Sequence, residues 1–169
     1  MPDAAPRTGG IGPWLAVAAV VIVLDQVTKV LVQGRFAYGE RLPVIEGFFD
    51  LVLLYNTGAA FSFLSDAGGW QRAFFIGIAV AASLLILLLL RRHAAETWFA
   101  AGLALILGGA VGNLIDRVWL GHVVDFLLFH FRGWHYPAFN VADSAITVGA
   151  AILIIDGLRG DRKEKVGHA

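Results

Sequence analysis

Two segments without a charged residue decide the fold class of this chain: AFFIGIAVAASLLILLLL at residues 73–90 and WFAAGLALILGGAVGNLI at residues 98–115. A helix of about 20 mostly apolar residues is long enough to cross the hydrocarbon core of a bilayer. Outward from these segments, the same criterion finds two more apolar runs, each carrying two charged residues. We therefore predict an all-α polytopic membrane protein, a bundle of four transmembrane helices at about residues 14–32, 72–90, 97–115 and 141–158.

The composition of the 169 residues excludes several classes of protein. Hydrophobic residues make up 58% and charged residues 15% of the chain, whereas about 25% of the residues of an ordinary soluble domain are charged. The charges of thirteen basic and thirteen acidic residues cancel, so the chain has no net positive charge with which to bind a nucleic acid. Because the chain has no cysteine, disulfides, thiolate metal sites and a cysteine nucleophile are also excluded.

The basic residues predict the orientation of the chain in the membrane. With four spans, both termini lie on one side, and the two longer loops, at about residues 33–71 and 116–140, lie on the other. Seven basic residues fall on the side of the termini and five on the side of the loops. By the positive-inside rule, we expect cytoplasmic termini and outer loops. No internal repeat divides the sequence, so we expect a single membrane domain over residues 1–169, ending in a solvated cytoplasmic tail at residues 159–169.

The first outer loop contains a predicted strand. Residues 48–55 are rich in types that favour strands, and the turn signal Asn56-Thr57-Gly58 follows them. We predict a short strand or hairpin at the membrane surface, with Gly58 in the turn. Residues 59–64 are compatible with the returning strand or with an interfacial helix anchored by Trp70, and the sequence does not decide between them.

Charged residues inside apolar spans require a reason. Lys29 follows Asp25 by four positions on the first helix, which places the two side chains on one face with the acid toward the N-terminus. We predict that they form a structural ion pair that faces the interior of the bundle.

The end of the third helix combines small and polar residues. Gly108 and Gly112 form a G-x-x-x-G step that lets a neighbouring helix approach closely. Asn113 and Arg117 share a face, beside Asp116, and are compatible with a polar cavity at the helix end. The alternative for Arg117 is a side chain that extends to the membrane interface.

Asp125 and Asp143 are the candidate catalytic residues. One straight helix over residues 125–143 would hold them about 27 Å apart, but Gly133 and Pro137 interrupt the segment, so the chain can return Asp143 to Asp125. Two carboxyl groups in one poorly hydrated pocket share a proton, which provides an acid and a base for activating water. The alternatives are an exposed loop carboxylate for Asp125 and, for Asp143, a capping box with Asn140.

Other catalytic sets have weaker support. The chain contains no H-E-x-x-H, G-x-S-x-G, phosphate-loop or dinucleotide-binding motif. His122, His130 and His135 flank Asp125, but histidines at a membrane interface are more often plain hydrogen-bonding residues than metal ligands. We expect no metal ion and no cofactor.

Five segments resemble, in order and spacing, the blocks of the lipoprotein signal peptidases, also called signal peptidase II, of bacterial membranes. They are Asp25-Gln26-Val27-Thr28-Lys29, Asn56-Thr57-Gly58-Ala59-Ala60-Phe61, Gly112-Asn113-Leu114-Ile115-Asp116-Arg117, Val123-Val124-Asp125-Phe126 and Phe139-Asn140-Val141-Ala142-Asp143-Ser144.

The resemblance implies an intramembrane aspartic protease with four transmembrane helices, a small outer β-sheet and a short interfacial helix. Asp125 and Asp143 would be its catalytic dyad. Substrate binding or support of the dyad would fall to Asn56, Gly58, Asn113, Arg117 and Asn140, and structural roles to Asp25, Lys29 and Asp116.

The same resemblance implies the partners and the location. The substrates would be prolipoproteins carrying a diacylglyceryl-cysteine, cut just before that cysteine, and globomycin-type inhibitors would bind. We expect a monomer in the bacterial inner membrane, in contact with membrane lipids and with its active site near the outer face.

Two other classes of function compete with this interpretation. A small transporter or proton relay would explain polar residues inside the spans, although these residues concentrate at the outer end instead of crossing the bilayer. A non-catalytic assembly factor would present the outer loops to partners. Replacement of Asp125 by asparagine separates these classes, because only an enzyme would lose its chemistry.

Overall fold

A computed structural model of the chain describes residues 9–58 and 70–166, with side chains as far as residue 159. Its helices confirm the four predicted spans, and each is long and apolar enough to cross a membrane. They are α1 (Gly12–Gln33), α2 (Trp70–His93), α3 (Thr97–Trp119) and α4 (Val141–Val166).

Two helix ends differ from the sequence prediction. Helix α3 continues to Trp119, one turn beyond the predicted span, so the outer loop begins later than residue 116. Asp116 and Arg117 are helical, in agreement with the helical face that the sequence predicted for Asn113 and Arg117. Helix α4 continues to Val166, so most of the predicted solvated tail is helical. Residues 162–165 are arginine, lysine, glutamate and lysine, which are good helix formers.

Helix α3 is the centre of the helical part and contacts α1, α2 and α4. A Cβ atom at Gly108 would lie 2.7 Å from the Cβ of Val21 in α1, and one at Gly112 would lie 2.7 Å from Oδ2 of Asp25 in the same helix. One at Gly109, between them, would overlap the carbonyl oxygen of Ala142 in α4. These glycines therefore let the backbones approach closely, and the predicted packing role of the G-x-x-x-G step is confirmed.

The outer loops form a four-stranded antiparallel sheet in the order β1-β2-β3-β4. The strands are β1 (Arg41–Ile45), β2 (Phe49–Asn56), β3 (Val123–Phe131) and β4 (Trp134–His135). Strand β2 confirms the prediction for the first loop, while the alternatives for residues 59–64, including the interfacial helix, lie outside the described residues. The sequence interpretation missed β3, which comes from the second outer loop and pairs with β2, Leu54 lying opposite Asp125.

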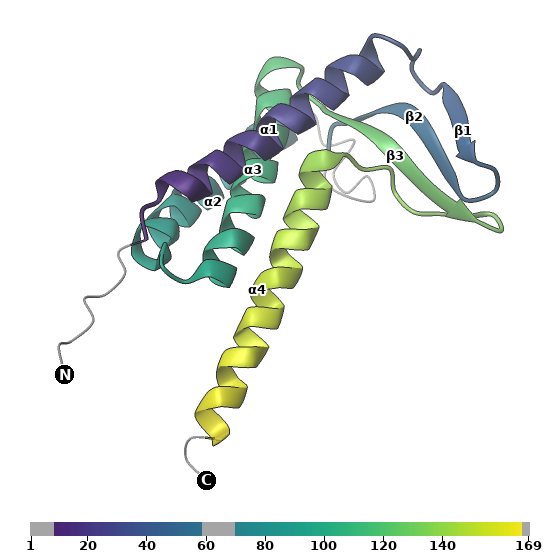
Figure 1. The fold of residues 1–169 in the computed structure, drawn as a ribbon. Coiled ribbons are helices and arrows are strands. Elements are labelled where there is room, and N and C mark those ends of the chain that lie inside the picture. Colours follow the sequence, from purple (N-terminus) through teal and green to yellow (C-terminus); the bar gives the residue numbers. More distant parts are fainter. Residues whose placement is uncertain (1–8, 59–69, 167–169) are drawn as a thin grey trace, which may run out of the picture.

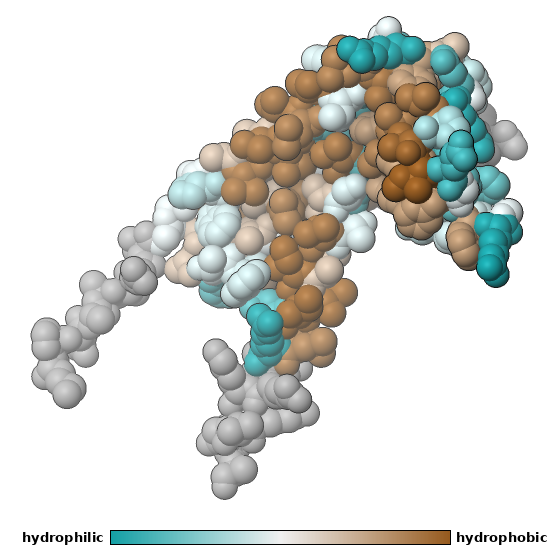
Figure 2. Space-filling view, turned by 45° about the vertical axis from the view of Figure 1, so that its right-hand side comes forward, coloured by the Kyte–Doolittle hydropathy of each residue, from teal (hydrophilic) through white to brown (hydrophobic). Residues whose placement is uncertain are grey.

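The sheet lies at one end of the helices, and the start of α1 and the end of α4 lie at the other (Figure 1). Hydrophobic side chains cover much of the visible surface of the helices, and hydrophilic side chains gather around the sheet, with a smaller group at the opposite end of the helices (Figure 2). This distribution is typical of a membrane protein whose sheet lies at one membrane surface.

Candidate active site

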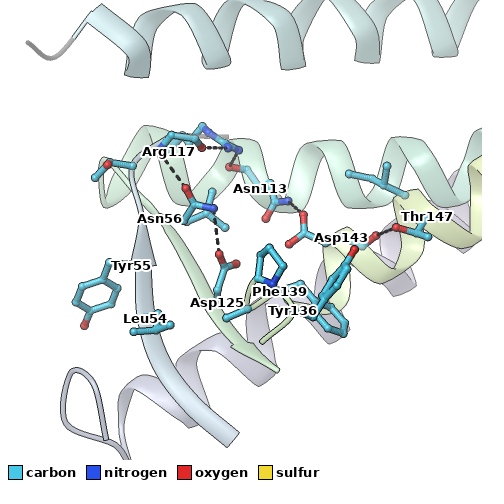
Figure 3. Close-up of a pocket in the computed structure, with 16 residues that line it drawn as sticks. Leu54, Tyr55, Asn56, Asn113, Arg117, Asp125, Tyr136, Phe139, Asp143 and Thr147 are labelled. Carbon is cyan, nitrogen blue, oxygen red and sulfur yellow. Dashed lines mark hydrogen bonds between the residues drawn. The ribbon is translucent and has the colours of Figure 1, made fainter. Parts of the chain in front are cut away.

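A cavity of about 480 Å³ lies where the sheet meets the helix ends (Figure 3). Its polar wall carries both candidate aspartates, two asparagines and an arginine, and its other wall is largely apolar or aromatic. The lining residues are Leu54, Tyr55, Asn56, Thr57, Gly58, Asn113, Arg117, Val123, Asp125, Tyr136, Pro137, Ala138, Phe139, Asp143, Ile146 and Thr147.

The path of the chain between the two aspartates explains how both reach this cavity. Strand β3 ends in a tight turn in which Gly133 has a φ of 85°, a conformation that glycine adopts without strain. The chain then returns along β3, where the backbone N–H of Phe139 donates to the carbonyl of Leu127 over 3.0 Å. Asp125 and Asp143 therefore line one cavity, as the interruptions at Gly133 and Pro137 predicted.

Asp125 is buried, although it belongs to an outer strand. Its side chain is 3% exposed, so the alternative of an exposed loop carboxylate is wrong. Asn140 donates to its Oδ1 over 2.7 Å and Asn56 donates to its Oδ2 over 3.2 Å. Burial, reinforced by the nearby carboxyl of Asp143, raises the pKa of Asp125 from 3.8 to about 7.

Asp143 lies in the first turn of α4, and its side chain points into the cavity beside that of Asp125 (Figure 3). Its Oδ1 accepts a hydrogen bond from the Asn113 amide over 2.8 Å. Its Oδ2 accepts one from the backbone N–H of Asn140 over 3.3 Å, while the Asn140 side chain accepts the backbone N–H of Asp143 over 2.9 Å. The capping box is thus confirmed, and it fixes the carboxyl group at the cavity instead of removing it.

Asn140 links the two aspartates. Its side chain is fully buried. Its amide nitrogen donates to the carboxyl group of Asp125, and its side-chain oxygen accepts the backbone N–H of Asp143. Its amide nitrogen also lies within hydrogen-bond distance of the carbonyl of Val124, at 3.2 Å. A single asparagine therefore holds the strand that carries one carboxyl group against the helix that carries the other.

Arg117 faces the cavity, together with Asn56 and Gly58 from the end of β2. Its guanidinium donates to the carbonyl oxygens of Gly58 and Asn113 over 3.3 Å each, and its Cζ lies 5.3 Å from the ring centre of Phe75. The side chain of Asn56 accepts the backbone N–H of Gly58 over 3.0 Å. Arg117 thus supplies a positive charge to the cavity wall and does not extend away to the interface.

The predicted ion pair is present behind the cavity and belongs to a larger cluster. Lys29 Nζ lies 2.8 Å from Asp25 Oδ2 and 2.8 Å from Asp116 Oδ2, and all three residues are at most 2% exposed. Gln26, which the sequence interpretation did not single out, donates to Asp116 Oδ1 over 2.9 Å. Gln26 is a polar residue directly after Asp25 in an otherwise apolar span, and this position could have identified it from the sequence.

The histidines around Asp125 are not assembled into a metal site. His122 packs against Tyr55 with ring centres 4.2 Å apart and ring planes tilted by 40°, and His130 Nε2 lies 3.1 Å from Asp50 Oδ1 in the sheet. Within residues 9–58 and 70–159, no three histidine, aspartate or glutamate side chains are placed to hold a metal ion. The sequence interpretation missed Tyr136, Phe139 and Thr147 as lining residues.

Comparisons with known proteins agree with this geometry. Residues 17–159 match a family model described as signal peptidase (SPase) II. A lipoprotein signal peptidase of Ralstonia nicotianae is 61% identical over 154 residues, covering 91% of this chain and 88% of that protein. One of Paraburkholderia phytofirmans is 57% identical over 163 residues, covering 94% of each.

The fold also matches a solved structure, described as a bacterial membrane enzyme determined by the in meso method at 2.3 Å resolution. The TM-score is 0.82 at 31% identity, and the match covers 92% of this chain and 93% of the other.

Proposed function

Because the chain belongs to the signal peptidase II family, we propose that Asp125 and Asp143 are the catalytic dyad of an intramembrane endopeptidase. Membership makes the protein a membrane aspartic protease that removes signal peptides from prolipoproteins in the bacterial inner membrane. One observation carries the assignment of the dyad: two carboxyl groups from separate elements line one cavity, and the same buried asparagine donates to both, from its side-chain amide to Asp125 and from its backbone N–H to Asp143.

The dyad activates water by sharing one proton, because two carboxyl groups in one buried cavity do not both ionise. The charged carboxylate takes a proton from a water molecule, whose oxygen attacks the scissile carbonyl carbon. The protonated carboxyl gives its proton to the carbonyl oxygen. The first carboxyl then returns its proton to the leaving nitrogen, the C–N bond breaks, and the second carboxyl regains a proton from the gem-diol.

The surrounding side chains suit this chemistry. The side-chain amides of Asn113 and Asn140 are neutral donors that orient the two carboxyl groups. Each carboxyl group can therefore gain or lose a proton without breaking an ion pair. Arg117 and Asn56 are placed to hold the substrate backbone. The apolar wall that includes Tyr136, Phe139 and Ile146 suits a lipid-modified residue, which supports cleavage just before a diacylglyceryl-cysteine.

The cavity lies at the outer face of the membrane in this proposal. Arg91 and Arg92 lie in the last turn of α2. This end of α2 is on the side where α1 starts and α4 ends, opposite the sheet (Figure 1). Basic residues on that side agree with cytoplasmic termini. A diacylglyceryl group anchors its cysteine near that interface, so the substrate approaches sideways from the lipid. The chain acts as one membrane domain and as a monomer, since one chain supplies both carboxyl groups. Globomycin-type inhibitors occupy the same cavity.

The test is cleavage of a diacylglyceryl-modified prolipoprotein by the purified, detergent-solubilised protein, followed as a mobility shift on a gel. Wild type, Asp125→Asn and Asp143→Asn are compared, with and without a chelator. We expect cleavage by the wild type alone, unaffected by the chelator. Cleavage by either folded variant would contradict the dyad. Failure of the wild type on a competent substrate would instead favour the transporter or the assembly factor.

A further inference from the structure

Lys29 has no part in the mechanism above, yet it is the cation of the buried cluster behind the cavity. An ammonium group has three N–H donors and no acceptor. In the structure, Lys29 Nζ meets three acceptors: Asp25 Oδ2 at 2.8 Å, Asp116 Oδ2 at 2.8 Å and Asn113 Oδ1 at 3.0 Å. Each donor therefore has one acceptor, in a site where Lys29 is 2% exposed.

Both carboxylates bound by Lys29 also hold the backbone immediately before a dyad residue. Asp25 Oδ1 accepts the backbone N–H of Ala142, which precedes Asp143, over 2.9 Å. Asp116 Oδ2 accepts the backbone N–H of Val124, which precedes Asp125, over 3.1 Å. The same ammonium group thus connects to both segments on which the dyad is built.

The third acceptor connects Lys29 to the dyad through a side chain. An asparagine amide has an acceptor end and a donor end, and only the acceptor end can face an ammonium group. Because Asn113 Oδ1 faces Lys29, its Nδ2 is turned toward the cavity, where it donates to Asp143 Oδ1 over 2.8 Å. Asn140 Nδ2 also lies 3.3 Å from Asn113 Oδ1, so Lys29, at 3.0 Å, is the closer of two donors that fix this orientation. Without the ammonium group, the amide of Asn113 is held less firmly and can rotate to present its oxygen to the carboxyl group of Asp143.

We propose that Lys29 is a positioning residue for the catalytic dyad, acting through the amide of Asn113 and through the two carboxylates that hold the backbone before Asp125 and Asp143. This proposal rests on the proposed function of the dyad. It assigns Lys29 a role in turnover, in addition to the structural ion pair that the sequence predicted.

The charge of Lys29 provides a second, independent readout. The charged groups that face Asp125 are Asp143 on α4, Lys29 on α1 and Arg117 on α3. The positive charge of Lys29 lowers the pKa of Asp125, against the larger opposing effect of burial. Removal of that charge should therefore move the alkaline limb of kcat/KM to higher pH, whereas a variant that only destabilises the fold should leave the limb in place.

The experiment compares Asp25→Asn with the double variant Asp25→Asn/Lys29→Met, so that the pair differs only in the ammonium group. The asparagine at position 25 still offers an oxygen to the backbone N–H of Ala142. We expect kcat per folded molecule to fall on the order of 10²-fold in the double variant, since a displacement of about 1 Å at the reacting groups has an effect of that size. KM should change less, and the alkaline limb should move upward.

Two further variants keep the result interpretable. Lys29→Gln retains two N–H donors for Asp25 and Asp116 but gives up the contact with Asn113, so it decides the question if the double variant does not fold. Gly102→Ala disturbs the packing of α3 on α4 at Leu153, eleven residues before Asn113 on α3, and serves as the control for destabilisation alone. Its kcat per folded molecule should match that of the wild type.

The outcomes are distinct from a failure of the proposed function. If the double variant, or Lys29→Gln in its place, retains kcat within about threefold of its parent and an unshifted alkaline limb, Lys29 only supports the fold and the proposal is wrong. If Gly102→Ala loses kcat to the same extent, the loss reflects destabilisation and the proposal is also wrong. A wild-type protein that cleaves no prolipoprotein would instead overturn the dyad itself.

Discussion

Two pairs of aspartates lie close together in this protein, and their partners differ. Asp25 and Asp116 share the ammonium group of Lys29, whereas the hydrogen-bond donors to Asp125 and Asp143 in the described residues are amides. A buried carboxylate that is paired with a cation stays charged and holds the structure. One that meets only neutral donors can exchange its proton. The comparison teaches that the partner, and not burial alone, separates a structural aspartate from a reactive one.

The largest expected effect comes from the pair held by amides. Asp125→Asn and Asp143→Asn should each lower kcat/KM by at least about 10³-fold, because each removes one of the two groups that transfer protons. Both variants should remain folded, since asparagine can still accept hydrogen bonds at either position. The matched control is Asp50→Asn, a buried carboxyl in β2 that pairs with His130 and does not line the cavity. Loss of activity in that control would break the comparison.

Loss of the cation that binds Asp25 and Asp116 should lower the stability of the folded protein. Lys29→Met leaves two buried carboxylates without their counter-ion, and we expect the free energy of unfolding to fall by about 3–5 kcal/mol. Equilibrium unfolding in mixed micelles measures the change. The Asp25→Asn/Lys29→Met variant should lose less, because only one uncompensated carboxylate remains. An equal loss in both variants would show that packing, and not charge, dominates this cluster.

The two pairs should also differ in their response to pH. The pKa of Asp125 is raised from 3.8 to about 7 in the folded protein, so between these values the folded state holds a proton that the unfolded state has lost. The stability contributed by this proton is present below pH 4 and is lost as the pH rises to about 7. The wild-type melting temperature should therefore decrease from pH 5 to 8 relative to that of Asp125→Asn.

Taking the difference between the two proteins removes the other groups that titrate in this range. Burial lowers the pKa of His122, which acts in the opposite direction, but this histidine is present in both proteins. The activity should follow the same ionisation, with kcat/KM falling about tenfold per pH unit above about 7 as the dyad loses its shared proton. A parallel pH dependence of the two melting temperatures would contradict the assignment.

A smaller effect should come from one amide of the dyad. Asn56→Ala removes the donor to Asp125 Oδ2, and a hydrogen bond to a charged group contributes about 1.5–3 kcal/mol, so we expect kcat to fall by about ten- to a hundredfold. Because the Asn56 amide lowers the pKa of Asp125, the alkaline limb should move upward. Thr57→Ala, which changes a neighbouring residue at the cavity, gives a comparison for loop effects. An unchanged limb would remove Asn56 from the set of partners.

Local patterns in the sequence predicted much of this structure. The four spans follow from apolar runs, β2 follows from strand-favouring residues before a turn, and the Asp25–Lys29 pair and the Asn140–Asp143 cap follow from spacings of four and three residues. Each of these features is formed by residues that are close in the chain, so the interactions that stabilise them are visible in a short window.

The features that the sequence interpretation missed depend on partners far away in the chain. Strand β3 is buried because it pairs with β2, which lies in the other outer loop, and a short apolar segment does not reveal such a partner. The last turn of α3 is helical where the predicted span had already ended, and there Asp116 meets Lys29 and the backbone of Val124. Gln26 joins the cluster only because α1 packs against α3.

The sequence by itself therefore determined the membrane architecture and the identity of the acids, because apolar length, helical spacing and five recognisable segments are properties of the linear chain. Only the tertiary structure decided which carboxyl groups meet a cation and which meet amides. That choice depends on close approach between α1, α3, α4 and β3, and the strength of a buried electrostatic interaction is set by distances and surroundings that no local window contains.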